Sequence, residues 1–376
     1  MKTLGSTIAL IGLIGSLAFP AHADDIKIGV IQGLSGAPVV VDFGESYLQG
    51  IEEAVKEYKA AGGKHNIQLI VYNDESNPQR AVQLAQRLIV NDKVPIAIGT
   101  VQSGNAAAFA PLFQEAKVPL MVGPAIATDI TAKFANEKPS YIFRCSMVEK
   151  YQVEALLDWA VKNFKKIGLV HSTAGYGIFA AGEIKKGLAE RGRELVAIEG
   201  VAPGVSEISP QMLKLKNAGV DLVLNFTEQF ELPYKAMSKI GYKPVVAGNW
   251  GLSSDMMRNI IGKEGMEGTV MGQAIDLSNP RAIDFDKKMK VAYGAKYRWP
   301  AVAALGYDGA RLVLIAIDKA GSNPAGIRDA LEATDNFQAI SGTPPKPYSA
   351  TDHECLDRRD VFLGVWRDGR VIKLAQ

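Results

Sequence analysis

Cysteine and histidine are scarce in this sequence. Its 376 residues include two cysteines, Cys145 and Cys355, and four histidines. Two cysteines exclude a disulfide-rich scaffold, so the hydrophobic core must hold the fold together. The pair could form one disulfide in an oxidising compartment or remain two buried thiols, and the sequence favours neither. Neither H-E-x-x-H nor C-x-x-C occurs, so no metal site is expected.

An excess of charge of either sign is also lacking. Lys and Arg number 42 against 40 for Asp and Glu, which argues against nucleic acid as a partner. Beyond the N-terminus, no run of roughly 18 continuous apolar residues indicates a transmembrane helix. Residues 1–23 have the pattern of a signal peptide, with Lys2, an apolar stretch over 8–19 and a small-x-small cleavage site ending at Ala23. We expect a soluble, exported protein; an N-terminal membrane anchor is the alternative.

The motifs of catalysis and cofactor binding are absent as well. There is no G-x-S-x-G nucleophile elbow and no Walker A loop. His353-Glu354-Cys355 looks reactive, but adjacency in sequence does not provide the geometry of a Cys–His pair. The turn at 174–177 is similar to a dinucleotide fingerprint, yet its next glycine, Gly182, comes two residues late for close helix–strand approach. We therefore expect neither an enzyme nor a bound cofactor.

What the sequence does contain is a regular alternation of strand and helix patterns. Ile26–Ile31 is typical of a buried strand, and Phe43, Tyr47, Ile51 and Val55 then recur at helical spacing. The same rhythm begins again after about residue 144, which predicts two consecutive doubly wound α/β halves. The other predicted strands are 67–72, 95–99, 119–123, 166–171, 194–201, 220–226, 245–250 and a hairpin over 361–374. The other predicted helices are 77–91, one after 103, and 176–191, 210–218, 232–241, 253–261, 282–297, 301–320 and 324–333.

Ligands of open α/β sheets bind beyond the carboxyl ends of the strands. There the sequence GTVQSGNAAAFA, residues 99–110, leads from a strand directly into a helix. Ser103 is a candidate N-cap, and the N–H groups after it lack helical partners. A second small, polar turn, Ala125-Ile126-Ala127-Thr128, follows the next strand. Since helix N-termini attract anions, the two turns together predict a grip for a carboxylate, although capping alone explains most such serines.

Several stretches jointly resemble one family, the periplasmic leucine/isoleucine/valine-binding proteins, which are type I substrate-binding proteins of ABC importers. The resemblance covers essentially the whole chain after residue 23. The matching stretches are 26–30 with 34–36, 43–50, 72–74 with 77–78, 99–103, 123–125, 176–177 and 352–354. The resemblance implies two α/β lobes joined by a hinge of three segments. It places one lobe at 24–144 plus 274–350 and the other at 145–273 plus 351–376, with both cysteines near the hinge.

The resemblance also implies a ligand site in the cleft between the lobes. The family's carboxylate grip falls on Ser103, with Gln102 beside it, and on Ala125, Ile126, Ala127 and Thr128. Its pocket aromatics fall on Phe43, Tyr176 and Phe226.

One position departs from the family's amino-acid binders. Asn249-Trp250 stands where they carry the acid that takes the ligand's ammonium group. A buried ammonium without a carboxylate costs several kcal/mol, whereas Trp250 offers a flat apolar face. A core position for Trp250 is the alternative, and Glu228 could serve as the missing acid.

These observations predict a periplasmic solute-binding protein that closes two lobes over a small hydrophobic or aromatic carboxylate and delivers it to an inner-membrane ABC permease. Within the class, a branched-chain or other amino acid is the alternative ligand. A ligand-sensing subunit of a membrane receptor is the alternative from another class.

Overall fold

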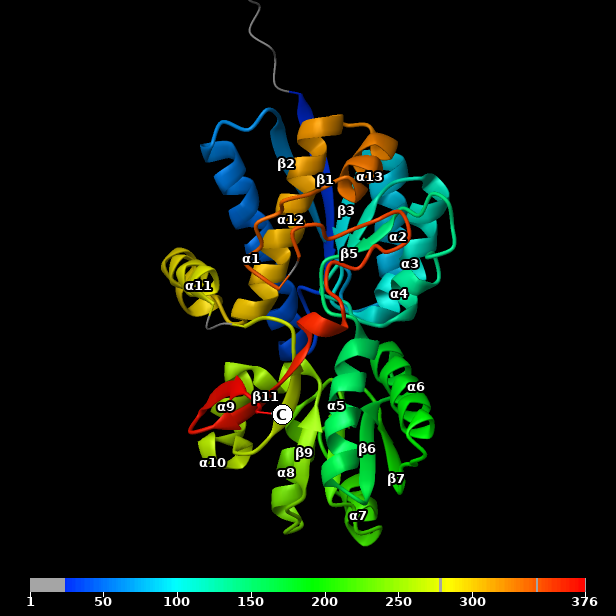
Figure 1. The fold of residues 1–376 in the computed structure, drawn as a ribbon, viewed down its shortest axis with the longest axis vertical. Coiled ribbons are helices and arrows are strands. Elements are labelled where there is room, and N and C mark those ends of the chain that lie inside the picture. The colour runs from blue at the N-terminus through cyan, green and yellow to red at the C-terminus, as the bar shows by residue number, and fades with distance from the viewer. Residues whose placement is uncertain (1–23, 277–278, 343, 376) are drawn as a thin grey trace, which may run out of the picture.

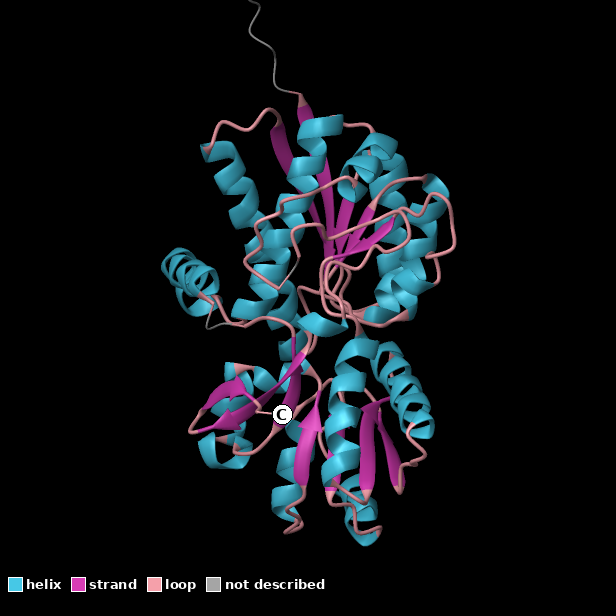
Figure 2. Ribbon diagram, viewed as in Figure 1, coloured by secondary structure: helices cyan, strands magenta, loops and turns pink. Residues whose placement is uncertain are grey.

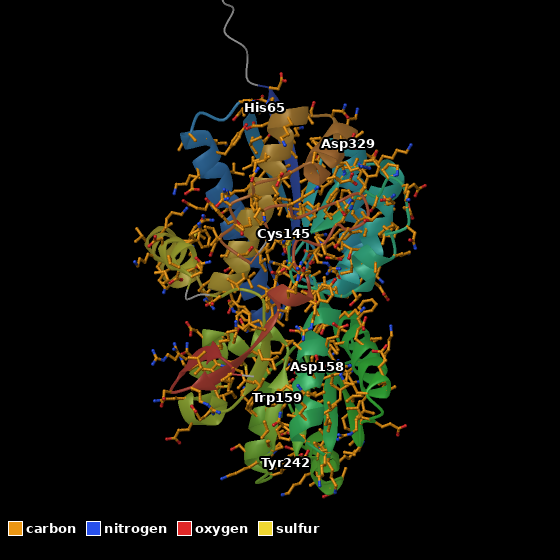
Figure 3. All side chains as sticks on the ribbon, in the orientation of Figure 1. His65, Cys145, Asp158, Trp159, Tyr242 and Asp329 are labelled. Carbon is orange, nitrogen blue, oxygen red and sulfur yellow. The ribbon has the colours of Figure 1, made fainter. Side chains whose placement is uncertain are left out.

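The computed structural model describes residues 24–276, 279–342 and 344–375, so the predicted signal peptide at 1–23 lies outside the described residues. Two α/β lobes are stacked along the long axis of the molecule (Figure 1). His65 and Asp329 lie at the far end of the upper lobe, and Asp158, Trp159 and Tyr242 lie in the lower lobe (Figure 3). The predicted fold class, a type I periplasmic binding protein with two doubly wound lobes, is confirmed.

The upper lobe is built on a parallel sheet of five strands in the order β2-β1-β3-β4-β5. Helices cover both of its faces (Figure 2). This lobe combines the start of the chain with later helices, because α12 packs against α1 and α13 packs against α12 (Figure 1). Its strands are β1 Asp25–Gln32, β2 Asn66–Asn73, β3 Ala97–Gly99, β4 Leu120–Val122 and β5 Ile142–Arg144. Its helices are α1 Pro38–Ala60, α2 Pro78–Arg87, η1 Leu88–Asp92, α3 Ser103–Ala116, α4 Asp129–Ala132, α12 Pro300–Ala320 and α13 Pro324–Glu332.

The lower lobe contains a seven-stranded sheet in the order β12-β11-β10-β9-β8-β6-β7. Strands β6 to β10 are parallel, and the hairpin of β11 and β12 adds an antiparallel edge. Its strands are β6 Ile167–Ser172, β7 Ala197–Val201, β8 Leu222–Phe226, β9 Val245–Gly248, β10 Val270–Gln273, β11 Phe362–Arg367 and β12 Arg370–Lys373. Its helices are α5 Glu149–Asn163, α6 Gly175–Glu190, α7 Ser209–Asn217, α8 Glu231–Lys239, η2 Trp250–Ser253, α9 Asp255–Ile261 and α10 Lys263–Met266.

Three connections join the sheets: β5 to α5, β10 to α11 Pro280–Tyr293, and α13 to β11, which includes η4 Arg358–Asp360. Helix α11 continues through η3 Gly294–Lys296 into α12. The predicted lobe boundaries at 144/145, 273/274 and 350/351 fall in or beside these connections and stay a proposal. Within the described ranges, α12 is the one helix long and apolar enough to cross a membrane, but most of its apolar window is buried in the fold. Helix α12 is therefore a helix of the protein core.

The predicted alternation matches most of the observed elements. Strands β5 and β10, helix α5 and the short helices α4 and α10 were not predicted individually. The spacing of Val153, Leu156, Leu157 and Ala160, all buried, was the signal for α5. Strands β5 and β10 are short, at three and four residues, and neither is followed by a small, glycine-containing turn of the kind that marks the ends of β3 and β4.

Candidate functional site

The carboxyl ends of strands from both sheets meet at one cavity between the lobes. The cavity is lined by residues after β3, β4, β6, β8 and β9 and by the first turns of α1. This inner cavity has a volume of about 60 Å³. It adjoins an outer chamber of about 480 Å³, with which it shares Val39, Val40, Gln102 and Glu228. In both lobes these loops follow the carboxyl ends of parallel strands, which is where ligands of open α/β sheets bind.

Most of the predicted site residues contribute to the inner cavity. Ser103, Gln102, Ile126, Phe43, Tyr176, Trp250 and Glu228 line it, together with Val39, Val40, Val101, Pro124, Phe230 and Asn249. None of these lining residues, all in the described part of the chain, is Lys, Arg or His. An anion held here must therefore be bound by N–H and hydroxyl groups and not by a basic side chain.

The prediction that Ser103 caps helix α3 is wrong. Ser103 is the first residue of α3, and the cap position belongs to Gln102, which makes no side-chain capping bond. Instead, the Ser103 hydroxyl accepts a hydrogen bond of 3.2 Å from the N–H of Ala127. Because the two turns face each other, the hydroxyl lies within reach of this N–H group, and Ser103 links the two turns directly. The predicted convergence of the two turns is therefore present, with a different role for the serine.

Only two of the four N–H groups in the turn from Ala125 to Thr128 are available to a ligand. The N–H of Ala125 donates to Thr100 O at 2.9 Å, and that of Ala127 is taken by Ser103. Within the described ranges, no group accepts from the N–H of Ile126 or Thr128. The Thr128 hydroxyl accepts from the N–H of Lys150 at 3.1 Å, on the side of the hinge. Ala125, Ala127 and Thr128 do not line the inner cavity, so Ile126 is the turn residue that reaches it.

An aromatic wall closes the other side of the cavity. The ring centroids of Phe43 and Trp250 are 5.3 Å apart, which is a contact between α1 of the upper lobe and η2 of the lower lobe. Trp299 extends the wall, with its centroid 4.1 Å from that of Phe43. Trp250 is largely buried and also lines the cavity, so the pocket and core interpretations both hold in part. Trp299, at the start of α12, was missed because nothing in the local sequence brings it to the N-terminal strands.

The prediction that Phe226 lines the pocket needs correction. Phe226 is the last residue of β8 and is fully buried in the core. Side chains alternate along a strand, and the chain then turns so that Phe230 reaches the cavity instead. Both phenylalanines lie at or just after the end of the same strand, so local sequence cannot choose between them.

Asn249 occupies the position at which an ammonium-binding acid is expected, and its side chain is already engaged. Its Nδ2 donates to the Tyr176 hydroxyl at 2.7 Å, and its Oδ1 accepts from the N–H of Gly251 at 2.6 Å. This residue therefore holds Tyr176 against the cavity. Burial of the Tyr176 ring raises the pKa of its hydroxyl well above 10, with the charges of Glu149 and Glu228 adding to the effect.

Glu228 is the one acid among the lining residues of the inner cavity. Burial raises the pKa of its carboxyl group, and a hydrogen bond with Gln102 opposes the rise. Its Oε1 atom is buried without a hydrogen-bond partner in the described structure. The carboxyl group is therefore poised either to stay protonated beside an anionic ligand or to ionise beside a cationic one.

His353 and Cys355, which looked reactive in the sequence, make structural contacts outside the inner cavity. Both ring nitrogens of His353 face acceptors, with Nδ1 3.0 Å from Ile142 O and Nε2 2.9 Å from Glu332. Cys145 and Cys355 are buried thiols in the hinge region. Among the described residues, no group of three or more His, Cys, Asp or Glu could hold a metal ion.

Comparisons with known proteins agree with this architecture. The sequence model of a family described as "Periplasmic binding protein" matches residues 25–370. A Leu/Ile/Val-binding protein homolog of Brucella melitensis is 28% identical over 98% of both chains. A leucine-, isoleucine-, valine-, threonine- and alanine-binding protein of Pseudomonas aeruginosa is 26% identical over 91% of both. A solute-binding protein of an ABC transporter from R. palustris, solved with 4-hydroxybenzoate, has a TM-score of 0.77 and 26% identity over 93% of this chain and 96% of that one.

Proposed function

Because the chain belongs to the periplasmic binding protein family, we propose that it is the solute-binding protein of an ABC importer for a small carboxylate with an aromatic or other hydrophobic body. Family members act in the periplasm, bind small molecules and work with ABC permeases. The family is one of binding proteins rather than enzymes, and catalysis forms no part of this proposal.

The observation that carries the proposal is the inner cavity itself. One end is lined by Ser103 and by Ile126, whose N–H has no acceptor in the described structure, and the other by the rings of Phe43 and Trp250. Such a cavity suits a molecule with one acidic end and one flat apolar end. The 4-hydroxybenzoate complex of the R. palustris relative supports an aromatic acid as the ligand class.

The protonation of Glu228 favours an acid without an ammonium group. With its pKa raised by burial, this carboxyl group is neutral more often than an exposed one and repels a nearby carboxylate less. Raising the pH ionises Glu228 and adds that repulsion. The affinity for an aromatic acid should therefore fall as the pH rises through the pKa of Glu228.

A branched-chain amino acid is the second candidate, and one observation favours it. The buried Oε1 of Glu228 has no partner, and an ammonium group would supply one. For this ligand the pH dependence has the opposite sign, because the ionised form of Glu228 attracts the cation. The branched-chain ligands in the name of the P. aeruginosa relative support this alternative.

The test is thermal unfolding of the purified protein against benzoate and leucine at several pH values. A ligand at a hundredfold excess over its Kd stabilises the native state by about 2.7 kcal/mol. We expect stabilisation by benzoate that weakens with rising pH, and the loss of this pH dependence in Glu228→Gln. Glu231→Gln is the matched control, because Glu231 borders only the outer chamber.

Two outcomes would contradict the proposed ligand class. Stabilisation by leucine alone, abolished in Glu228→Gln, would establish the amino-acid alternative. Stabilisation by neither probe at millimolar concentration would exclude both classes.

A further inference from the structure

One arginine, Arg144 at the end of β5, is fully buried beneath the turn from Ala125 to Thr128. A buried charge is costly unless it is paired and hydrogen-bonded. Arg144 does not line the inner cavity. The role of Arg144 therefore follows from the groups that its guanidinium group contacts. The inference below rests on the proposed function, since it concerns the same carboxylate end of the site.

The guanidinium group is bound to the backbone of the turn. Nη1 donates to Ala125 O at 2.9 Å, and Nη2 donates to Ala127 O at 2.8 Å. Nη2 also donates to the Thr131 hydroxyl at 2.8 Å, in the helix that follows the turn. One planar group thus fixes two carbonyls of the turn and its exit into α4.

The orientation of these carbonyls fixes the orientation of the next N–H groups. The peptide bonds after Ala125 and Ala127 are trans, and in a trans peptide the C=O and N–H bonds point in opposite directions. Because both carbonyls point at Arg144, the N–H groups of Ile126 and Thr128 point away from it. They are also the two N–H groups of the turn that have no acceptor in the described structure.

Arg144 is itself held by the third connection between the lobes. Its Nε lies 2.8 Å from Oε2 of Glu354, an ion pair whose geometry is not that of a hydrogen bond. Its backbone N–H donates to His353 O at 2.9 Å, and its carbonyl accepts from the N–H of Cys355 at 3.2 Å. The first and third connections are therefore tied together at this residue.

We propose that Arg144 is the positioning residue of the carboxylate grip: it fixes the carbonyls of Ala125 and Ala127 on its own side of the turn, so that the N–H group of Ile126, the turn residue that lines the cavity, faces the ligand. It holds this arrangement through Glu354, which couples the grip to the hinge. The positive charge of Arg144 also adds to the potential felt by a carboxylate on the other side of the turn. Arg144 acts through the turn and does not touch the ligand.

Arginine suits this role better than lysine. The guanidinium fork presents several donors in one fixed plane, whereas an ammonium group is a single point of charge. A lysine at this position keeps the charge but cannot reach both carbonyls and Glu354 with the same geometry. Arg144→Lys therefore separates the positioning of the turn from the presence of a positive charge.

The experiment compares Arg144→Lys with Arg193→Lys. Arg193 also donates to backbone carbonyls, those of Val161, Phe164 and Lys165, but in the lower lobe outside the cavity. Affinities are measured for benzoate against benzamide and for leucine against leucinamide. Charged hydrogen bonds are the stronger ones, so we expect the preference for the acid over its amide to fall at least about tenfold in Arg144→Lys and to stay unchanged in Arg193→Lys. A merely structural weakening would lower both members of each pair alike.

Hydrogen exchange of the peptide covering residues 124–128 supplies a readout that needs no ligand. We expect faster exchange in Arg144→Lys and unchanged exchange in Arg193→Lys. If neither benzoate nor leucine binds the wild-type protein, the proposed ligand class fails while this comparison still decides the role of Arg144. If Arg144→Lys does not fold, Glu354→Gln should show the same effects with smaller size. An acid-to-amide preference and an exchange rate equal to wild type would overturn the proposal.

Discussion

At the scale of single residues, the carboxyl group of Glu149 has a strongly raised pKa. It lies at the start of α5 and is fully buried. Burial raises its pKa from 4.5 to about 8, although a hydrogen bond of 2.9 Å from the side-chain amide of Gln152 and the charge of Arg144 oppose the rise. Its second oxygen has no hydrogen-bond partner in the described structure. The native protein therefore keeps Glu149 protonated at neutral pH.

This protonation predicts how stability depends on pH. Between 4.5 and about 8 the native state binds the proton and the unfolded state has lost it, so the free energy of unfolding falls as the pH rises. Each pH unit in that window should cost about 1.4 kcal/mol from this group. In Glu149→Gln this part of the decline should disappear. Urea unfolding of both proteins at a series of pH values measures the difference.

Glu190→Gln is the control for this prediction, because Glu190 is exposed at the end of α6. Its stability profile should follow that of the wild-type protein. Parallel profiles for Glu149→Gln and wild type would mean that Glu149 is ionised in the native state.

At the scale of elements, two glycines allow α1 and α12 to cross closely in the core of the upper lobe. A Cβ atom at Gly50 would lie 2.1 Å from Ala303 O and 2.6 Å from Tyr307 N. A Cβ atom at Gly306 would lie 2.2 Å from Tyr47 O. These neighbours are backbone atoms of the opposite helix, so they cannot give way by rotating a side chain.

Gly50→Ala should therefore destabilise the protein although alanine favours a helix. Overpacking of a core costs about 1–3 kcal/mol, against a gain in helix propensity of up to about 1 kcal/mol. Gly182→Ala on α6, where a Cβ atom would meet nothing within 4 Å, should show the gain alone. Thermal unfolding of the two variants would contradict this account if both were stabilised.

At the scale of the whole molecule, the first turns of α3 and α6 bring the two lobes together. A Cβ atom added to Gly175 would lie 2.9 Å from the Cα of Gly104. The contact joins the upper lobe to the lower lobe beside the outer chamber, which both glycines line. Along with the contact of Phe43 and Trp250, it limits how closely the lobes can approach.

Gly175→Ala should hold the lobes slightly apart and weaken ligand binding. A clash of about 1–3 kcal/mol that acts on closure corresponds to about a 5- to 150-fold rise in the Kd for benzoate. The free energy of unfolding without ligand should change little, because lobes that move apart in the ligand-free protein avoid the clash. Titration calorimetry with Gly182→Ala as control measures the effect, and an unchanged Kd would show that closure does not bring these turns together.

The order of strands and helices could be derived from the sequence, because it depends on local periods. Apolar residues at i, i+3 and i+4 and short buried runs record which face of each element is covered. The alternation of the two patterns then leads to parallel sheets, whose carboxyl ends carry the loops of a site. For this reason the turns at Ser103 and at Ala125–Thr128 could be named before the structure was known.

Only the tertiary structure decided which side chains meet at the site. The bond between Ser103 and Ala127, the wall of Phe43, Trp250 and Trp299, and the choice of Phe230 over Phe226 all depend on contacts between distant segments. The inward turn of two carbonyls toward Arg144 likewise depends on a hinge segment more than 200 residues away. Local patterns cannot specify these contacts, because a side chain's partner across a cleft is set by how whole elements pack.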